Sequence, residues 1–253
     1  MAGLSLFRLS GKTAMHRFFI NHGDIQDNQA TLAGTEAHHL RHVLRLGPGQ
    51  EIELFDGSGA VYLARVSRVG KEIELVITEQ RTTAPETPTL SIAQGILKGK
   101  KMDFVVQKAC ELGVATFIPF HSDHCAVPIP RDAKTFRWEK IIMEACKQCG
   151  RPIPLEVAAV ADFDTLLAAA APYACKLIFW EKETRFHLAG LPPLTAIPSI
   201  IALIGPEGGF SEAEIDKAVQ VGFTAFSLGR RSLRAETATL SVMAILQYLG
   251  NKL

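Results

Sequence analysis

From residue 89 onward, two kinds of apolar run alternate along the chain. Short runs with the composition of buried strands take turns with longer runs whose apolar residues recur at helical spacing. The strand-like runs are Leu90–Gln94, Thr116–Phe120, Leu177–Trp180, Ile200–Ile204 and Ala225–Leu228. The helical runs are Asp103–Leu112, Lys134–Cys149, Phe163–Ala170, Glu212–Val221 and Glu236–Leu249. Strands that alternate with helices form parallel sheets, so residues 90–253 are predicted to be an α/β domain.

The segment before it, residues 15–83, has short alternating runs separated by glycine-rich turns, which predicts a small β-barrel. Its strand-like runs are Arg17–Ile20, Glu51–Phe55, Val61–Val66 and Ile73–Ile77. Thr35 is expected to cap a short helix with Leu40, Val43 and Leu44 on its apolar face. Residues 81–88 contain two prolines and no periodicity, and we place the linker at 84–89. Residues 1–14 are interpreted as an extension outside the fold.

Charge and cysteine content narrow the function classes. The 27 Lys and Arg against 26 Asp and Glu provide no bulk attraction for nucleic acid. Residues 94–151, however, include ten basic residues and six acidic ones. This local excess of positive charge indicates either a solvated face or a polyanion-binding surface. Five dispersed cysteines argue against a disulfide framework and for a reducing, cytoplasmic location. The most apolar stretch, residues 166–180, is interrupted by Pro172 and Lys176, so no membrane span is expected.

The first segment that indicates chemistry follows the strand-like run Ile200–Ile204. Gly205, Gly208 and Gly209 come directly after it, and Ser211 with Glu214 forms a capping box that predicts a helix start. Loops at the carboxyl ends of parallel strands are where open α/β sheets bind ligands. The alternative is a tight strand-to-helix turn. We favour a binding loop because such a turn needs one glycine rather than three.

The second segment follows Ala225–Leu228. Gly229 is followed by Arg230, Arg231 and Arg234, and a helix begins near Glu236. That helix is apolar nearly all round, so it must be covered by its own sheet or by a second subunit. The arginines are either solvated or placed to bind a phosphate or a developing oxyanion.

Taken together, these motifs resemble the SPOUT class of RNA methyltransferases, specifically the RsmE family. The resemblance rests on residues 16–19, 39–40, 43–45, 98–102, 107–113, 144–151, 205–209 and 228–238. The chain departs from the family pattern at Ser232 and Ala235, where Ile and Thr are usual. It also has Ser122-Asp123-His124 where Ser-Glu-Arg is more frequent.

The resemblance implies a PUA-like barrel that helps to hold RNA, followed by a domain with a trefoil knot. It implies that the protein uses S-adenosylmethionine to methylate N3 of a uridine in small-subunit (16S) ribosomal RNA during ribosome assembly. The expected partners are ribosomal RNA in small-subunit particles and a second copy of the chain, bound through the knot domain. No metal is expected, because the sulfonium is its own electrophile. Alternatives are another SPOUT enzyme with a different target, a non-catalytic RNA-binding protein, and a small-molecule enzyme that uses a nucleotide.

The resemblance also assigns site residues. The cofactor is expected at Leu203, Ile204, Gly205, Glu207, Gly208, Gly209, Leu228, Gly229, Leu233 and Thr237. Arg234 is expected to stabilise the uridinate oxygen or an adjacent phosphate, and Glu236 is either the general base or a helix cap. The basic region between residues 94 and 151 and the helix of the first segment predict RNA contacts at Lys98, Lys101, Lys108, Arg151, Arg41 and Arg45, and contacts are also expected at Arg17 and Arg231.

Overall fold

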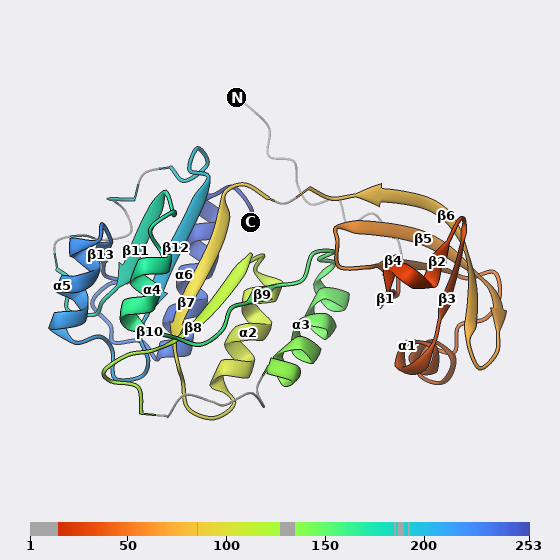
Figure 1. The fold of residues 1–253 in the computed structure, drawn as a ribbon, viewed down its shortest axis with the longest axis horizontal. Helices are drawn as coiled ribbons and strands as arrows, with labels where there is room; N and C mark the ends of the chain where they lie inside the picture. Colours follow the sequence, from red (N-terminus) through yellow and green to blue (C-terminus); the bar gives the residue numbers. More distant parts are fainter. Residues whose placement is uncertain (1–14, 85, 127–134, 185, 187–189, 192) are drawn as a thin grey trace. The chain divides into compact units, whose positions relative to one another are not determined.

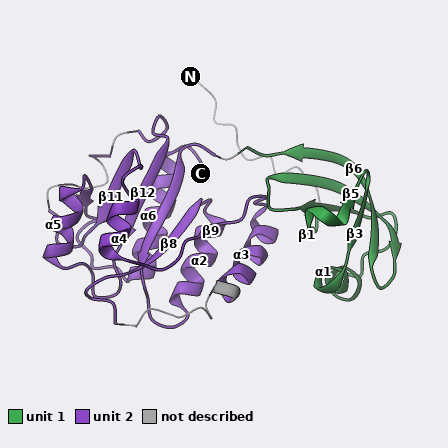
Figure 2. Ribbon diagram, viewed as in Figure 1, with its two compact units in different colours: residues 1–84 green, residues 85–253 purple. Residues whose placement is uncertain are grey.

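The computed structural model describes residues 15–84, 86–126, 135–184, 186, 190–191 and 193–253 (Figure 1). The extension interpreted at residues 1–14 lies outside the described residues. The chain divides into two compact units, residues 1–84 and 85–253 (Figure 2).

Unit 1 is a six-stranded sheet with the order β1-β4-β5-β6-β3-β2. Its strands are β1 (Arg17–Phe19), β2 (Ile25–Gln26), β3 (Gln29–Leu32), β4 (Glu51–Phe55), β5 (Ala60–Val69) and β6 (Ile73–Thr82). Only β1 and β4 pair in parallel, and the remaining pairs are antiparallel. The four predicted strands are present, whereas β2 and β3 were not predicted. β6 continues to Thr82, so it includes the first two residues of the aperiodic stretch 81–88.

The helical segment of unit 1 differs from the prediction. α1 (Gly34–His38) begins after Ala33, with no side-chain cap, so Thr35 lies inside the helix rather than at its cap. The chain then continues into the π-helical turn η2 (His39–Val43), in which Leu44 N bonds to His39 O at 3.0 Å. Leu40 is buried as expected, but Val43 is 60% exposed. The wider turn changes the angular spacing of side chains, which removes Val43 from the apolar face.

Unit 2 is built on a parallel sheet with the order β10-β8-β7-β12-β11-β13, and the short β9 pairs with β8. The strands are β7 (Thr89–Gly95), β8 (Thr116–His121), β9 (Glu156–Val157), β10 (Ala161–Asp162), β11 (Cys175–Phe179), β12 (Ser199–Ile204) and β13 (Thr224–Phe226). Every recorded pair is parallel. This confirms the predicted α/β class. The trefoil knot stays a prediction.

Five helices connect or cover these strands among the described residues. They are α2 (Lys101–Glu111), α3 (Thr135–Cys149), α4 (Phe163–Ala169), α5 (Glu212–Gln220) and α6 (Ala235–Leu249). α4 and α5 share a core cluster with Ile201 and Leu203 of β12. α6 packs on β7, β12 and α2 through buried side chains that include Val242 and Leu246. Helices therefore cover the sheet, and loops form the edge at which its parallel strands end.

Two features are absent from the residues that the structure describes. No helix there combines the length and the apolar composition that crossing a membrane requires. No group of three or more His, Cys, Asp or Glu side chains is arranged there to hold a metal ion.

Candidate active site

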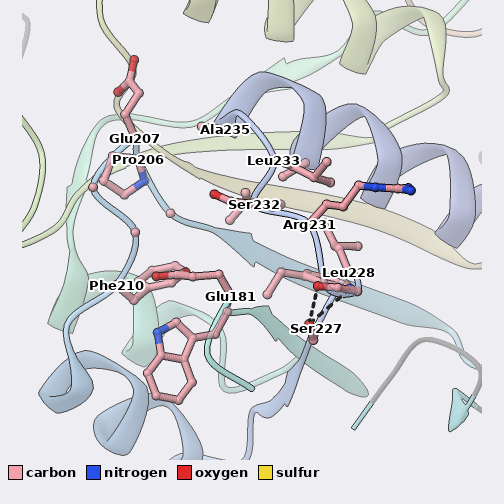
Figure 3. A pocket seen from close by; sticks show the side chains of 18 of the residues that line it. Glu181, Pro206, Glu207, Phe210, Ser227, Leu228, Arg231, Ser232, Leu233 and Ala235 are labelled. Carbon is pink, nitrogen blue, oxygen red and sulfur yellow. Dashed lines mark hydrogen bonds between the residues drawn. The ribbon is translucent and has the colours of Figure 1, made fainter. Parts of the chain in front are cut away.

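Three loops at the carboxyl edge of the sheet form a pocket of about 330 Å³ (Figure 3). The loops follow β11, β12 and β13, which are neighbours in the sheet. The pocket is lined by residues 179–181, 204–210 and 227–233, together with Ala235 and Ala238 of α6. Because parallel strands end at the same edge, the two glycine segments predicted from the sequence both line this pocket, although β11 lies between their strands.

Eight of the ten predicted cofactor residues line this pocket: Ile204, Gly205, Glu207, Gly208, Gly209, Leu228, Gly229 and Leu233. The other two do not. Leu203 has no exposed surface and belongs to the core cluster with α4 and α5, because successive strand residues point to opposite faces. Thr237 is exposed on α6, whose Ala235 and Ala238 line the pocket instead, one helical turn apart.

The glycine loop after β12 folds back on itself. A Cβ atom on Gly205 would lie 3.1 Å from the carbonyl carbon of Gly209. Gly209 has a φ of +69°, a conformation that favours glycine, and its N–H donates to Pro206 O at 2.9 Å. A Cβ atom on Gly208 would lie 2.7 Å from His124 Cβ. Packing inside the protein therefore already requires all three of these glycines. Their number alone does not separate a binding loop from a structural turn, and the pocket is the stronger observation.

The loop after β8 holds the glycine loop from one side. The predicted capping box is present, with Glu214 N bonded to Ser211 Oγ at 3.2 Å and Ser211 N to Glu214 Oε2 at 2.9 Å. Asp123 N donates to the same Glu214 carboxylate at 3.0 Å. His124 Nδ1 lies 3.0 Å from Gly208 O. The position where the family more often has arginine is therefore used here to contact the glycine loop.

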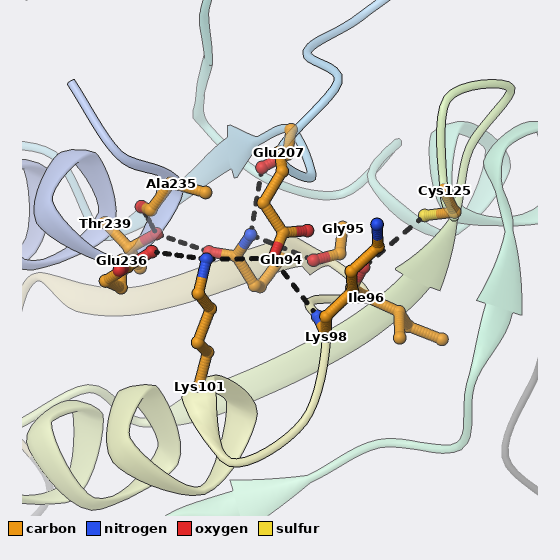
Figure 4. Close-up of polar contacts among 11 residues, drawn as sticks. Gln94, Gly95, Ile96, Lys98, Lys101, Cys125, Glu207, Ala235, Glu236 and Thr239 are labelled. Carbon is orange, nitrogen blue, oxygen red and sulfur yellow. Dashed lines mark hydrogen bonds and ion pairs between the residues drawn. The ribbon is translucent and has the colours of Figure 1, made fainter. Parts of the chain in front are cut away.

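A buried amide holds the glycine loop from beneath (Figure 4). Gln94, at the end of β7, has no exposed surface, and its Nε2 donates to Gly95 O at 2.9 Å and to Gly205 O at 3.0 Å. The hydroxyl of the buried Thr239, on α6, donates to Gln94 Oε1. This pair was not predicted. The available signal was a glutamine near the end of a strand whose other residues are small or apolar.

An ion-pair cluster connects the glycine loop with α2 and α6 (Figure 4). Lys101 Nζ lies 3.0 Å from Glu207 Oε1 and 3.4 Å from Glu236 Oε2. Glu207 Oε1 also accepts from Lys98 N at 3.2 Å. The hydrogen bond to Glu207 raises the pKa of the Lys101 ammonium above its ordinary value. Lys101, predicted as an RNA contact, is therefore already paired with two carboxylates.

The arginines after β13 lie at or beside the pocket. Arg230 and Arg231 line it, and Arg231, predicted as an RNA contact, is exposed there. Arg234 is exposed at the N-cap position of α6, and its side chain makes no capping hydrogen bond. Its chain neighbours, Leu233 and Ala235, both line the pocket. Arg234 is thus next to the pocket along the chain.

The remaining predicted RNA contacts differ in exposure. Arg17 is 8% exposed and bonds Glu53 at 2.5 Å, which leaves little of its guanidinium for a phosphate. Arg41 donates to Gly70 O at 2.6 Å, and Arg151 donates to Ile153 O at 2.5 Å. Lys108 pairs with Glu111 at 2.7 Å. Arg45 in unit 1 and Lys98 in unit 2 are exposed.

Family models match both units. The model described as an RNA methyltransferase domain matches residues 85–247, and one described as an RNA methyltransferase PUA domain matches residues 32–78. The chain belongs to the RNA methyltransferase family. This RNA methyltransferase is 32% identical over 231 residues to the ribosomal RNA small subunit methyltransferase E of Buchnera aphidicola (subsp. Schizaphis graminum), covering 88% of this chain and 92% of the relative. It is 29% identical to the Bacillus subtilis protein of the same name, covering 92% and 96%.

Solved structures agree with this assignment. The RNA methyltransferase superposes with a TM-score of 0.82 and 33% identity on the ribosomal RNA small subunit methyltransferase E of Neisseria gonorrhoeae bound to S-adenosyl methionine, covering 93% of this chain and 98% of that one. A methyltransferase of Legionella pneumophila in complex with the same cofactor gives a TM-score of 0.82 at 32% identity, with the same coverage.

Proposed function

We propose that this RNA methyltransferase transfers a methyl group from S-adenosylmethionine to N3 of a uridine in small-subunit ribosomal RNA. The observation that carries the proposal is the pocket built by the three loops after β11, β12 and β13. It belongs to a chain whose relatives carry the name of this activity and whose solved neighbours hold the cofactor.

The pocket suits this cofactor on its own chemistry. Its volume of about 330 Å³ lies in the range of small-molecule sites. The Nε1 atom of Trp180, a lining residue, is buried and has no hydrogen-bond partner among the described residues. A buried donor of this kind needs an acceptor, and the cofactor offers several in its base, ribose and carboxylate. The main chain of residues 204–209 and 228–233 would hold it.

When bound, S-adenosylmethionine supplies an electrophilic methyl group. The protein must place the uridine in line with that methyl group and favour loss of the imide proton. Alignment of this kind is worth about 7–11 kcal/mol, more than a single side-chain contact. We propose that Arg234 stabilises the negative charge on the uridine oxygen. Because Glu236 is already paired with Lys101, we propose that it anchors the start of α6 and does not accept the proton.

Three experiments test the function. Isothermal titration calorimetry should give one S-adenosylmethionine bound per chain, and a protein that only binds RNA would show no heat. Mass spectrometry of ribosomal RNA from cells that lack the gene should show one uridine without its methyl group, restored by the gene on a plasmid. An unchanged small-subunit RNA contradicts the proposal, and loss of a methyl group at another nucleotide identifies a different target.

Deletion of unit 1 should abolish methyl transfer to RNA. An enzyme that acts on a small molecule would retain its activity without this unit.

We also propose that the protein is a homodimer through unit 2. Beyond the residues that pack on the sheet, α6 leaves an apolar side partly uncovered. Tyr248 is 69% exposed, and Leu240, Ala244 and Ile245 are intermediate. A second copy of the chain would cover this side. That would also explain why the helix has few polar residues.

Lys101→Met is expected to weaken S-adenosylmethionine binding by about fivefold, because the glycine loop loses its ion pair with α2. Its effect on the salt dependence of RNA binding is expected to be negligible, since the ammonium is paired with Glu207 and Glu236. Calorimetry and RNA titrations separate the two effects. Lys100→Met, at an exposed neighbour, is the control. If Lys101→Met changes only RNA affinity, Lys101 contacts RNA instead.

Arg45→Ala is expected to lower RNA affinity and to reduce the slope of log K against log salt by about 0.7–0.9, the value for one lost phosphate contact. Arg45 is an exposed arginine at the end of the helical segment of unit 1. Fluorescence anisotropy with a labelled ribosomal RNA fragment at several salt concentrations measures the slope. Arg65→Ala is the control, because Arg65 is exposed in the same unit but pairs with Glu51 at 3.2 Å. Equal slopes for wild type and Arg45→Ala would contradict the contact.

A further inference from the structure

Glu181 is a charged side chain of the pocket that comes from neither predicted glycine segment. It follows β11 and lines the cavity with Trp180 (Figure 3). Its carboxylate lies against the glycine loop: a Cβ atom on Gly209 would lie 2.9 Å from Glu181 Oε1 and 3.2 Å from Oε2. The loop after β11 therefore places a carboxylate against the backbone of the glycine loop that follows β12.

The two carboxylates of the pocket differ in their partners. Glu207 is held by Lys101 at 3.0 Å and by Lys98 N at 3.2 Å. Across the part of the chain that the structure describes, no hydrogen bond or ion pair is recorded for Glu181. A carboxylate in a ligand pocket with no cation of its own favours a ligand that brings a positive charge.

The place of Glu181 in the sheet indicates which charge it meets. β11 lies between β12 and β13, so Glu181 is on the middle one of the three loops. The two outer loops are the ones proposed to hold the cofactor, so Glu181 comes from the loop between them. The central charged atom of S-adenosylmethionine is the sulfonium. After methyl transfer it becomes a neutral thioether, while the ammonium and carboxylate of the molecule are unchanged.

On the basis of the proposed function, we infer that Glu181 recognises the sulfonium charge and thereby makes the pocket bind the donor more tightly than the demethylated by-product. Transfer of the methyl group removes the positive charge that Glu181 attracts. The by-product then leaves more readily and fresh donor replaces it. Glu181 is a specificity-determining residue in this account, and the transfer itself does not need it as an acid or a base.

The test is calorimetry of S-adenosylmethionine and S-adenosylhomocysteine with the whole chain. Glu181→Gln keeps the shape of the side chain and removes its charge. It is expected to weaken S-adenosylmethionine binding by about tenfold and S-adenosylhomocysteine binding by less than about twofold. Glu181→Asp, which keeps the charge, is expected to retain most of the preference. Glu212→Gln is the matched control, since Glu212 has the same charge but lies outside the pocket and is 75% exposed.

Each result separates the possibilities. A selective loss for the sulfonium ligand supports the inference. Equal losses for both ligands place Glu181 at the ammonium and overturn it, as does the absence of any change. If Glu181→Gln does not fold, a wild-type-like preference in Glu181→Asp supports the inference, and the loss of the preference overturns it. If the wild-type protein binds neither ligand, the proposed function has failed, which is a different result from failure of the inference.

Discussion

Arg234→Ala is expected to slow methyl transfer to RNA by about 10²–10³-fold and to leave the affinity for S-adenosylmethionine within about twofold. Losing one donor that stabilises a developing oxyanion typically has an effect of this size. Arg234 is exposed at the pocket rim, between two residues that line the pocket. It is not itself a lining residue, so we expect cofactor binding not to depend on it.

Single-turnover kinetics with saturating cofactor and RNA measure the rate of transfer, and calorimetry measures the affinity. Arg234→Lys is expected to recover part of the rate, because an ammonium keeps the charge but not the two-pronged geometry of a guanidinium. Arg65→Ala, which removes the same charge from the other unit, should transfer at the wild-type rate. Near wild-type turnover in Arg234→Ala would show that another group stabilises the uridine.

Much of the fold could be predicted because its signals are local. β4 has the predicted bounds, and β12 begins one residue earlier than predicted, since apolar runs and turn residues mark strand ends directly. β2, β9 and β10 were not predicted, because two residues carry no periodicity. β3 was missed for a related reason. Its four residues become a strand by pairing with β6, more than 40 residues away.

The site could be predicted only in part for the same physical reason. The two glycine segments have recognisable local patterns, and both line the pocket. The third loop has a strand end but no glycine pattern, so Glu181 was missed. Lys101 was predicted as an RNA contact from its basic neighbourhood. The carboxylates that pair with it are more than 100 residues further along the chain, where no local pattern relates them to it.

Gln94 is the clearest example of a site residue whose partners lie far away in the sequence. Its replacement is expected to have the second largest effect among the variants, on both stability and cofactor affinity. Gln94→Leu removes the amide that donates to Gly95 O and Gly205 O, so both buried carbonyl groups lose that donor. The Thr239 hydroxyl loses one of its two acceptors and keeps Ala235 O at 2.8 Å. Each buried polar group left without a partner costs about 1–3 kcal/mol. We therefore expect a clear loss of unfolding free energy. Because Gly205 opens the glycine loop, we also expect S-adenosylmethionine affinity to fall by at least about tenfold.

The loss of affinity separates a positioning residue from one that is only structural. Tyr173→Phe is the matched control, because the Tyr173 hydroxyl bonds Ser91 Oγ at 2.9 Å, toward the opposite end of the same strand. It is expected to lower stability without changing affinity in the folded protein. Thr239→Val, which removes the hydroxyl and keeps the shape, should weaken affinity less than Gln94→Leu. The double variant should lose less than the sum of the two, since both remove one connected network. Gln94→Leu could lower the melting temperature as Tyr173→Phe does and still bind the cofactor like wild type. That result would show that the glycine loop keeps its shape without the amide, through its own backbone turn.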